Sequence, residues 1–128
     1  MKKVIITGCS GSIGAYLANF FKKKKYKVIG LDKQNSILRG IDFYKVDMSN
    51  EVKLKKVYKK IILKHKKIEV LVNSAGLIHN ELILNIANNF KTHSYKSWKK
   101  VIKNNLDLTF LNSKFFIDNF NKNYSEEK

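Results

Sequence analysis

The chain has 128 residues, enough for one domain and too few for two. Its apolar fraction of 44% is typical of a globular protein, and its one cysteine excludes a disulfide framework. No apolar run approaches the roughly 18 residues of a membrane span, and no signal-peptide core follows the first lysines. We therefore expect a reduced, cytoplasmic protein without a membrane partner.

The formal net charge of +16 comes from 25 Lys and one Arg against 10 acidic residues. Lys, Asn and Ile, all encoded by A/T-rich codons, make up 53 of the 128 residues, so a base bias of the genome explains the charge. Proteins that read nucleic acid favour the arginine fork, which is nearly absent here. A basic nucleic-acid-binding protein therefore stays only a lesser alternative.

Apolar runs rich in β-branched residues predict four strands, at residues 4–7, 27–31, 41–46 and 69–72. Helical periodicity predicts three helices, from residue 13 to about 25, from 50 (capped by Ser49 or Asn50) to about 65, and from 97 to about 120. Residues 32–41 are expected to hold one helical turn, and residues 77–96 a loop with some helix at 82–87. This order predicts an α/β fold with a parallel sheet over residues 1–118, followed by a polar tail, 119–128.

Three glycines stand between the first predicted strand and the first helix, where a dinucleotide-binding turn belongs. Gly8 permits a tight turn, Gly11 permits close approach of a pyrophosphate, and Gly14 lets the helix lie close to the sheet. Free N–H groups at the helix start favour phosphates. Further donors in this turn are Ser10, Ser12 and Ile13. An ordinary tight turn is the alternative.

Asp32 ends the second predicted strand, 18 positions after Gly14. A carboxylate there accepts hydrogen bonds from the ribose hydroxyls and repels a 2′-phosphate, which favours NAD over NADP. Lys33 argues the other way, because a cation can hold that phosphate. No Walker-type lysine follows the turn, which argues against nucleotide hydrolysis. The spacing of the three histidines predicts no metal site, and Cys9 is interpreted as a small turn residue.

Four motifs together resemble the short-chain dehydrogenase/reductase family, in the family's order and spacing. They are the glycine turn, Val46-Asp47-Met48-Ser49, Asn73-Ser74-Ala75-Gly76, and Trp98 with Val101, Ile102, Asn105 and Leu106. The resemblance implies a Rossmann-like doubly wound sheet, with strand order 3-2-1-4 in the part covered. It also implies hydride transfer between nicotinamide and a carbonyl or alcohol substrate.

The resemblance implies cofactor contacts for Asp47 and Met48 near the adenine, and for Asn73, Ala75 and Gly76 near the nicotinamide ribose. The alternative for Asp47 is a helix N-cap acid, and the alternative for Asn73 is a structural hydrogen bond at the strand end. Asn105 lies on the helical face of Val101 and Leu108, so we expect it to be buried and paired.

In the family the residue matching Asn105 holds a water that links the catalytic lysine to a proton relay, which makes it the one catalytic candidate here. A satisfied core asparagine is the alternative. The glycine spacing departs from the classical family pattern, because position 12 is Ser and the glycine stands at position 11. With the long segment between Gly76 and Trp98, this resembles members of sugar pathways.

The family's catalytic Ser and Tyr-x-x-x-Lys would follow a fifth strand, so the resemblance implies that the chain is truncated before them and inactive alone. Two chance matches, Tyr95/Lys99 and Tyr124/Lys128, stand in the wrong order or with no strand before them. The last helix carries apolar residues around much of its circumference, which predicts a homo-oligomer through that helix. A non-catalytic nucleotide-binding or regulatory module that pairs with a full-length partner is the remaining alternative.

Overall fold

A computed structural model describes the backbone of residues 1–125 and the side chains of residues 1–118. Four parallel strands form the main sheet: β1 (Lys3–Thr7), β2 (Lys27–Asp32), β3 (Asp42–Lys45) and β4 (Val70–Asn73). Their order is β3-β2-β1-β4, which confirms the predicted topology and leaves β4 at an edge of this sheet in the described chain.

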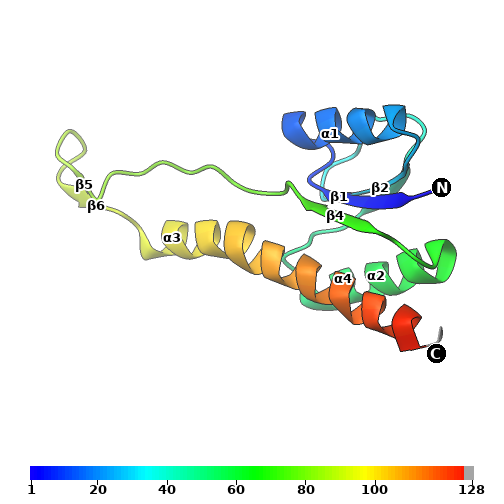
Figure 1. The fold of residues 1–128 in the computed structure, drawn as a ribbon. Helices are drawn as coiled ribbons and strands as arrows, with labels where there is room; N and C mark the ends of the chain where they lie inside the picture. Colours follow the sequence, from blue (N-terminus) through cyan, green and yellow to red (C-terminus); the bar gives the residue numbers. More distant parts are fainter. Residues whose placement is uncertain (126–128) are drawn as a thin grey trace.

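Helices cover both faces of the sheet (Figure 1). On one face, α1 (Ser12–Lys23) packs Ala18 and Leu17 against Val4, Ile6 and Val28. On the other face lie α2 (Glu51–His65) and α4 (Leu108–Ser125), whose core side chains meet Ile5, Ile29 and Leu31. The central strands are thus buried on both faces, as their continuous apolar runs predict.

The α2–α4 contact is built around a buried polar pair. The Tyr58 hydroxyl donates to Asn112 Oδ1 at 3.0 Å, and Asn112 Nδ2 donates to the Leu108 carbonyl at 2.8 Å. Tyr58 and Asn112 are each 1% exposed, and burial raises the pKa of the Tyr58 phenol. This pair fixes α4 against α2, because neither polar group can exchange its partner for water.

The second helix begins at its expected residue. Asn50 is the N-cap of α2, and its side chain accepts a hydrogen bond from the Lys53 N–H at 3.0 Å. The prediction of a helical turn within residues 32–41 is wrong, since the segment between β2 and β3 forms bends without a helix. The connection from Asp32 at the end of β2 to Asp42 at the start of β3 is too short to need a helix.

Residues 76–102 leave the body of the fold as a projecting segment, called the arm below (Figure 1). The predicted helix at 82–87 is wrong: β5 (Leu84–Asn85) and β6 (Lys91–Thr92) form a short antiparallel hairpin. Asn85 Oδ1 accepts from the Asn88 N–H at 3.1 Å, and Asn89 adopts a φ of 49°. These local asparagine turns compete with the helix that the apolar spacing suggested.

The third predicted helix is longer than expected and carries a defect. It runs as α3 (Tyr95–Ile102), a π-helical turn η1 (Lys103–Asp107) and α4, with Ser94 as N-cap. The backbone continues as helix to Ser125, past the predicted end near residue 120. The side chains of the predicted polar tail, and residues 126–128 altogether, lie outside the described residues. No helix among the described residues is long and apolar enough to cross a membrane.

Candidate dinucleotide-binding site

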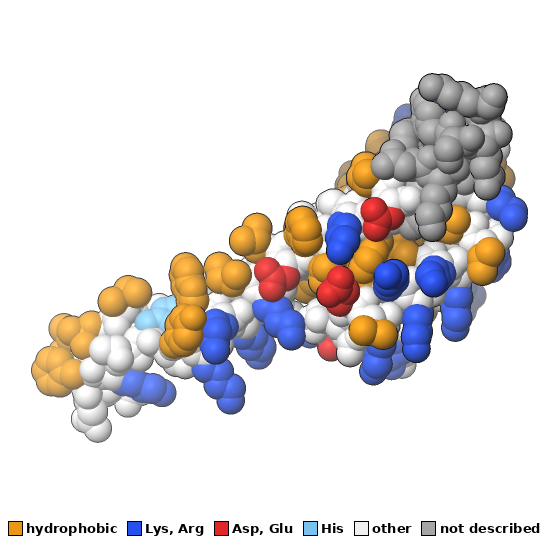
Figure 2. All heavy atoms as spheres, turned by 90° about the horizontal axis from the view of Figure 1, so that it is seen from below, with side chains coloured by type: hydrophobic (Ala, Val, Ile, Leu, Met, Phe, Trp, Pro, Cys, Tyr) orange, Lys and Arg blue, Asp and Glu red, His pale blue; other side chains and the backbone are white. Residues whose placement is uncertain are grey.

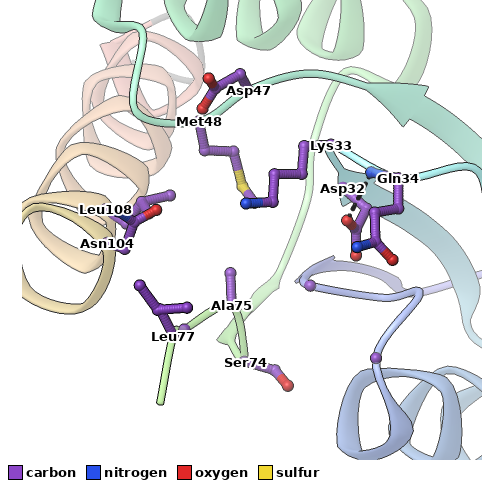
Figure 3. Close-up of a pocket in the computed structure, with 13 residues that line it drawn as sticks. Asp32, Lys33, Gln34, Asp47, Met48, Ser74, Ala75, Leu77, Asn104 and Leu108 are labelled. Atoms are coloured by element: carbon purple, nitrogen blue, oxygen red, sulfur yellow. Dashed lines mark hydrogen bonds between the residues drawn. The ribbon is translucent and has the colours of Figure 1, made fainter. Parts of the chain in front are cut away.

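A cleft opens where the carboxyl ends of β1, β2 and β4 meet, the usual ligand position in an open parallel sheet (Figure 3). Its lining comes from the glycine turn, the ends of β2 and β4, the start of the α2 connection, and the last long helix. The lining residues are Gly8, Gly11, Asp32, Lys33, Gln34, Asp47, Met48, Ser74, Ala75, Gly76, Leu77, Asn104 and Leu108.

The glycine turn forms a cradle that leaves no room for a side chain at two of its three glycines. Gly8 has a φ of +67°, and a Cβ on it would lie 2.7 Å from Cα of Ala75. A Cβ on Gly14 would lie only 2.1 Å from the Gly8 carbonyl oxygen, whereas one on Gly11 would be 3.4 Å from the same atom. Gly8 and Gly14 are therefore required by backbone packing, and Gly11 keeps the floor of the cleft open.

The first turn of α1 begins at this cradle. Gly11 is the N-cap and provides no side-chain hydrogen bond, so the N–H groups at the helix start have no capping partner. A helix start of this kind, beside a glycine cradle, suits the negative oxygens of a pyrophosphate.

Asp32 connects the end of β2 to the glycine turn. Its Oδ2 accepts from the Ser10 N–H and its Oδ1 from the Gln34 N–H, each at 2.9 Å, and the residue is 8% exposed. The carboxylate therefore orders the turn as well as lining the cleft. The Lys33 side chain extends into the cleft toward Met48 (Figure 3).

Asp47 lies at the opposite wall and is exposed. Its Oδ1 accepts from the Ser49 hydroxyl at 2.8 Å and the Ser49 N–H at 3.0 Å. These hydrogen bonds, together with the charges of Lys33 and Lys103, lower the pKa of the Asp47 carboxyl. The alternative that Asp47 is the N-cap of α2 is wrong, because Asn50 is that N-cap. Asp47 instead forms a turn with Ser49, just before the helix.

Thr7 connects β1 to the end of β4, and sequence reasoning did not single it out. Its hydroxyl oxygen accepts from the N–H groups of Ser74 and Ala75, each at 3.1 Å, and the residue is 1% exposed. The chain after β4 is thereby held against the glycine turn. The sequence signal that could have indicated this role is the position of Thr7 as the last residue of β1, directly before Gly8.

Asn105 lies in η1 and pairs with the main chain of Leu77. Its Oδ1 accepts from the Leu77 N–H at 2.7 Å, and its Nδ2 donates to the Leu77 carbonyl at 2.9 Å. The expected pairing is present, but the expected full burial is wrong: Asn105 is half-buried, because it stands where the arm leaves the sheet.

Six predicted site residues do not line the cleft directly. They are Ser10, Ser12, Ile13, Gly14, Asn73 and Asn105. Asn73 Nδ2 donates to the Ser113 hydroxyl of α4 at 3.2 Å, which matches its structural alternative, and Ile13 is 70% exposed. Sequence reasoning missed Gln34, Ser74, Leu77, Asn104 and Leu108, although each is close in sequence to a residue that it named.

Cys9 packs beneath the cleft and is fully buried against Gly30, where a Cβ would lie 2.6 Å from the sulfur. Burial, with the nearby Asp32 charge, raises the pKa of its thiol to about 11, so the thiol is poorly suited to act as a nucleophile. Within the described residues, no three His, Cys, Asp or Glu side chains form a metal-binding group.

The donor set fits a dinucleotide: a side-chain-free cradle, uncapped helix N–H groups and two carboxylates at the strand ends. The family model described as short chain dehydrogenase matches residues 2–126. The chain belongs to this family. A 3-oxoacyl-[acyl-carrier-protein] reductase, FabG, of Chlamydia pneumoniae is 31% identical over 116 residues, covering 82% of this chain and 44% of that protein.

Solved structures have the same fold. The ligand-free aldohexose dehydrogenase of Thermoplasma acidophilum superposes with a TM-score of 0.80 at 30% identity, covering 92% of this chain and 44% of that one. ElxO with NADP bound gives a TM-score of 0.81 at 26% identity, covering 94% and 51%. This short-chain dehydrogenase chain thus spans about half the length of the proteins that it matches.

Proposed function

We propose that these residues form the cofactor-binding part of an NAD-dependent oxidoreductase of the short-chain dehydrogenase family. The observation that carries the proposal is the position of Asp32, at the end of β2 beside the glycine turn, within a cleft that has a side-chain-free floor. Gly8, Gly11 and the start of α1 would hold the pyrophosphate. Asp32 would receive the adenosine ribose, and Asp47 with Met48 would border the adenine.

The choice of NAD over NADP rests on charge at the ribose position. A buried carboxylate next to a 2′-phosphate is unfavourable, and both Asp32 oxygens are already fixed by main-chain N–H groups, so the side chain has little freedom to turn away. Related structures carry either cofactor: 4-hydroxyisoleucine dehydrogenase is complexed with NADH, and ElxO has NADP bound. Lys33 is the counter-argument, because its exposed ammonium lines the same cleft and could pair with a 2′-phosphate.

The reaction of the whole protein is also a proposal. A bound nicotinamide supplies or accepts the hydride, while the protein binds and orients the cofactor and positions the substrate. Within this chain, Asn105 acts as a positioning residue, since it fixes the main chain after Gly76. The similarity to an aldohexose dehydrogenase supports a sugar-derived carbonyl or alcohol substrate. The catalytic Ser, Tyr and Lys would lie outside these residues, so we expect no turnover by this chain alone.

The test is a calorimetric titration of the 128-residue chain with NAD⁺ and NADP⁺. We expect saturable binding of NAD⁺, weaker binding of NADP⁺, and loss of NAD⁺ binding in Asp32→Ala. Asp118→Ala is the matched control, because it removes the same charge from an exposed position on α4. Equal loss in both variants, or no NAD⁺ binding by a folded wild-type chain, contradicts the proposal.

A further inference from the structure

The arm places a set of large apolar side chains in solvent. On the hairpin and the segments that flank it, and on α3, these side chains are between 47% and 89% exposed. They are Ile78, Leu82, Ile83, Leu84, Ile86, Phe90, Tyr95 and Trp98. No residue of α3 is buried. Figure 2 shows hydrophobic side chains gathered at the tip and along one edge of the arm.

Lysines follow the other edge of the arm (Figure 2). On α3 the two kinds of residue largely separate by helical spacing: Tyr95, Trp98 and Ile102 recur at i, i+3 and i+7, while three exposed lysines lie on another side. These lysines are Lys96, Lys100 and, in η1, Lys103. Lys99 lies between the two sides, with its ammonium over the Tyr95 ring, 4.7 Å from the centroid. Exposed Lys91 extends the cationic edge to the hairpin.

The base of the arm is ordered without help from a partner. Glu81 is the one acid in residues 76–102, and its Oε2 lies 3.1 Å from His79 Nε2. Its Oε1 accepts from the N–H of Ser94, the N-cap of α3, and the His93 N–H donates to the Ile83 carbonyl. Glu81 thus ties both ends of the hairpin to α3, so the apolar tip is presented at low entropic cost.

Shape and charge together select the partner. The apolar side chains lie on a projecting hairpin and helix, which can insert into a soft layer. A second copy would bring two lysine edges together, which repel. An amphipathic helix with Trp on one side and Lys on the other, next to exposed apolar side chains, fits the boundary of an anionic bilayer. We propose that the arm docks on an anionic lipid surface, with its apolar side chains among the acyl chains and its lysines at the headgroups.

This interaction concerns the surface only and needs no membrane span, but it departs from the sequence-based expectation of no membrane partner. The sequence alone does not reveal the apolar and cationic edges of the arm, because Ile and Lys are abundant along the whole chain. Only the fold separates the apolar residues that are buried in the sheet from those of the arm.

The test uses the 128-residue chain, whose single tryptophan is Trp98, with vesicles of phosphatidylcholine alone or mixed with phosphatidylglycerol. Flotation reports binding, and Trp98 emission reports its environment. We expect the chain to float only with the anionic vesicles, with a blue shift of the emission that salt reverses. Ile83→Gln/Ile86→Gln should reduce flotation and the blue shift together.

The charge is tested with two triple variants that change the net charge equally. Lys96→Glu/Lys99→Glu/Lys100→Glu should weaken vesicle affinity by about 100-fold, since each of the three lysines near an anionic surface contributes about fivefold. Lys55→Glu/Lys56→Glu/Lys59→Glu alters exposed positions on α2 and should bind nearly as the wild type does. Circular dichroism verifies that every variant is folded.

Three results would overturn the proposal. One is equal loss of binding in the two triple variants, which would mean that net charge alone drives it. Another is equal flotation with neutral and anionic vesicles. The third is a Trp98 shift that depends on protein concentration and not on vesicles, which would make another copy of the chain the partner.

Discussion

The side chain of Asn105 forms two hydrogen bonds with the main chain of Leu77, at 2.7 Å and 2.9 Å. This pairing joins the π-helical turn η1 to the segment that leaves β4, where Gly76 borders the cleft. A Cβ on Gly76 would lie 2.9 Å from Asn105 Oδ1, so the contact also requires a glycine there. A π-helical turn inside a long helix often marks a functional position, and here it presents this amide.

Asn105→Ala removes both hydrogen bonds and leaves the Leu77 main chain without its partner. We expect the free energy of unfolding to fall by about 1–3 kcal/mol, measured by urea denaturation. Asn104→Ala is the control, because Asn104 Nδ2 donates only to the Lys100 carbonyl of its own helix. If the two variants lose equal stability, the Asn105–Leu77 pairing has no special weight.

Gly14→Ala and Gly11→Ala separate the packing and binding roles of the glycine turn. The Gly14→Ala methyl would clash with the Gly8 carbonyl, so we expect a loss of about 1–3 kcal/mol of stability or more. Gly11→Ala should leave thermal stability nearly unchanged, since its methyl has ordinary contact distance, yet weaken NAD⁺ binding at the cleft floor. A reversed order of the two stabilities would contradict the cradle described above.

Thr7→Val replaces the buried hydroxyl by a methyl group of similar size. The N–H groups of Ser74 and Ala75 then lose their acceptor, and we expect about 1–3 kcal/mol of destabilisation in denaturant unfolding. Thr7→Ser keeps the oxygen and should lose clearly less. An equal loss in both would show that the methyl packing matters, and not the hydroxyl.

Stability should fall as the pH decreases through about 6.5, the usual pKa of histidine. His65 is buried, and burial lowers the pKa of its imidazole although the Asp42 carboxylate lies 3.2 Å away. The unfolded chain therefore takes up the proton at a higher pH than the folded chain, and protonation favours unfolding. Thermal melting between pH 8 and about 5 should follow this course. The loss should shrink in His65→Gln and persist in His79→Gln.

The apolar side chains of the last long helix, η1 and α4, predict that the chain self-associates through this helix. Leu108 and Phe115 are buried in the core, but Leu106 and Phe110 are 64% and 63% exposed. We expect sedimentation velocity to show concentration-dependent association, reduced in Leu106→Gln/Phe110→Ser. Leu63→Gln, on α2 at a position that is 74% exposed, should leave the association unchanged. A monomer at all concentrations would refute this interface.

The strands could be predicted because β-branched runs and glycine punctuation are local signals, whereas their order in the sheet followed from the resemblance to the family. Local signals also predict the glycine turn, Asp32 and Asn50. The hairpin at β5 and β6 could not, since its apolar spacing is compatible with a helix and the outcome depends on asparagine turns with positive φ. Weak local preferences of this kind are decided by a few hydrogen bonds.

The sequence left the roles of two predicted site residues open. Asp47 and Asn73 were each compatible with a ligand contact or a structural bond, and only the fold separates them: Asp47 lines the cleft, whereas Asn73 bonds to Ser113. Thr7 was missed because its role depends on Ser74 and Ala75, which are 67 and 68 positions away in the chain. Contacts at this separation have no signature in a single sequence.

Hydrogen exchange of the 128-residue chain, with and without NAD⁺, reports where on the chain the cofactor binds. We predict slower exchange in the glycine turn, residues 8–14, and in residues 74–77, with the arm hairpin at 84–92 unchanged. Protection confined to the arm, or no protection anywhere at saturating NAD⁺ in a folded chain, would contradict it.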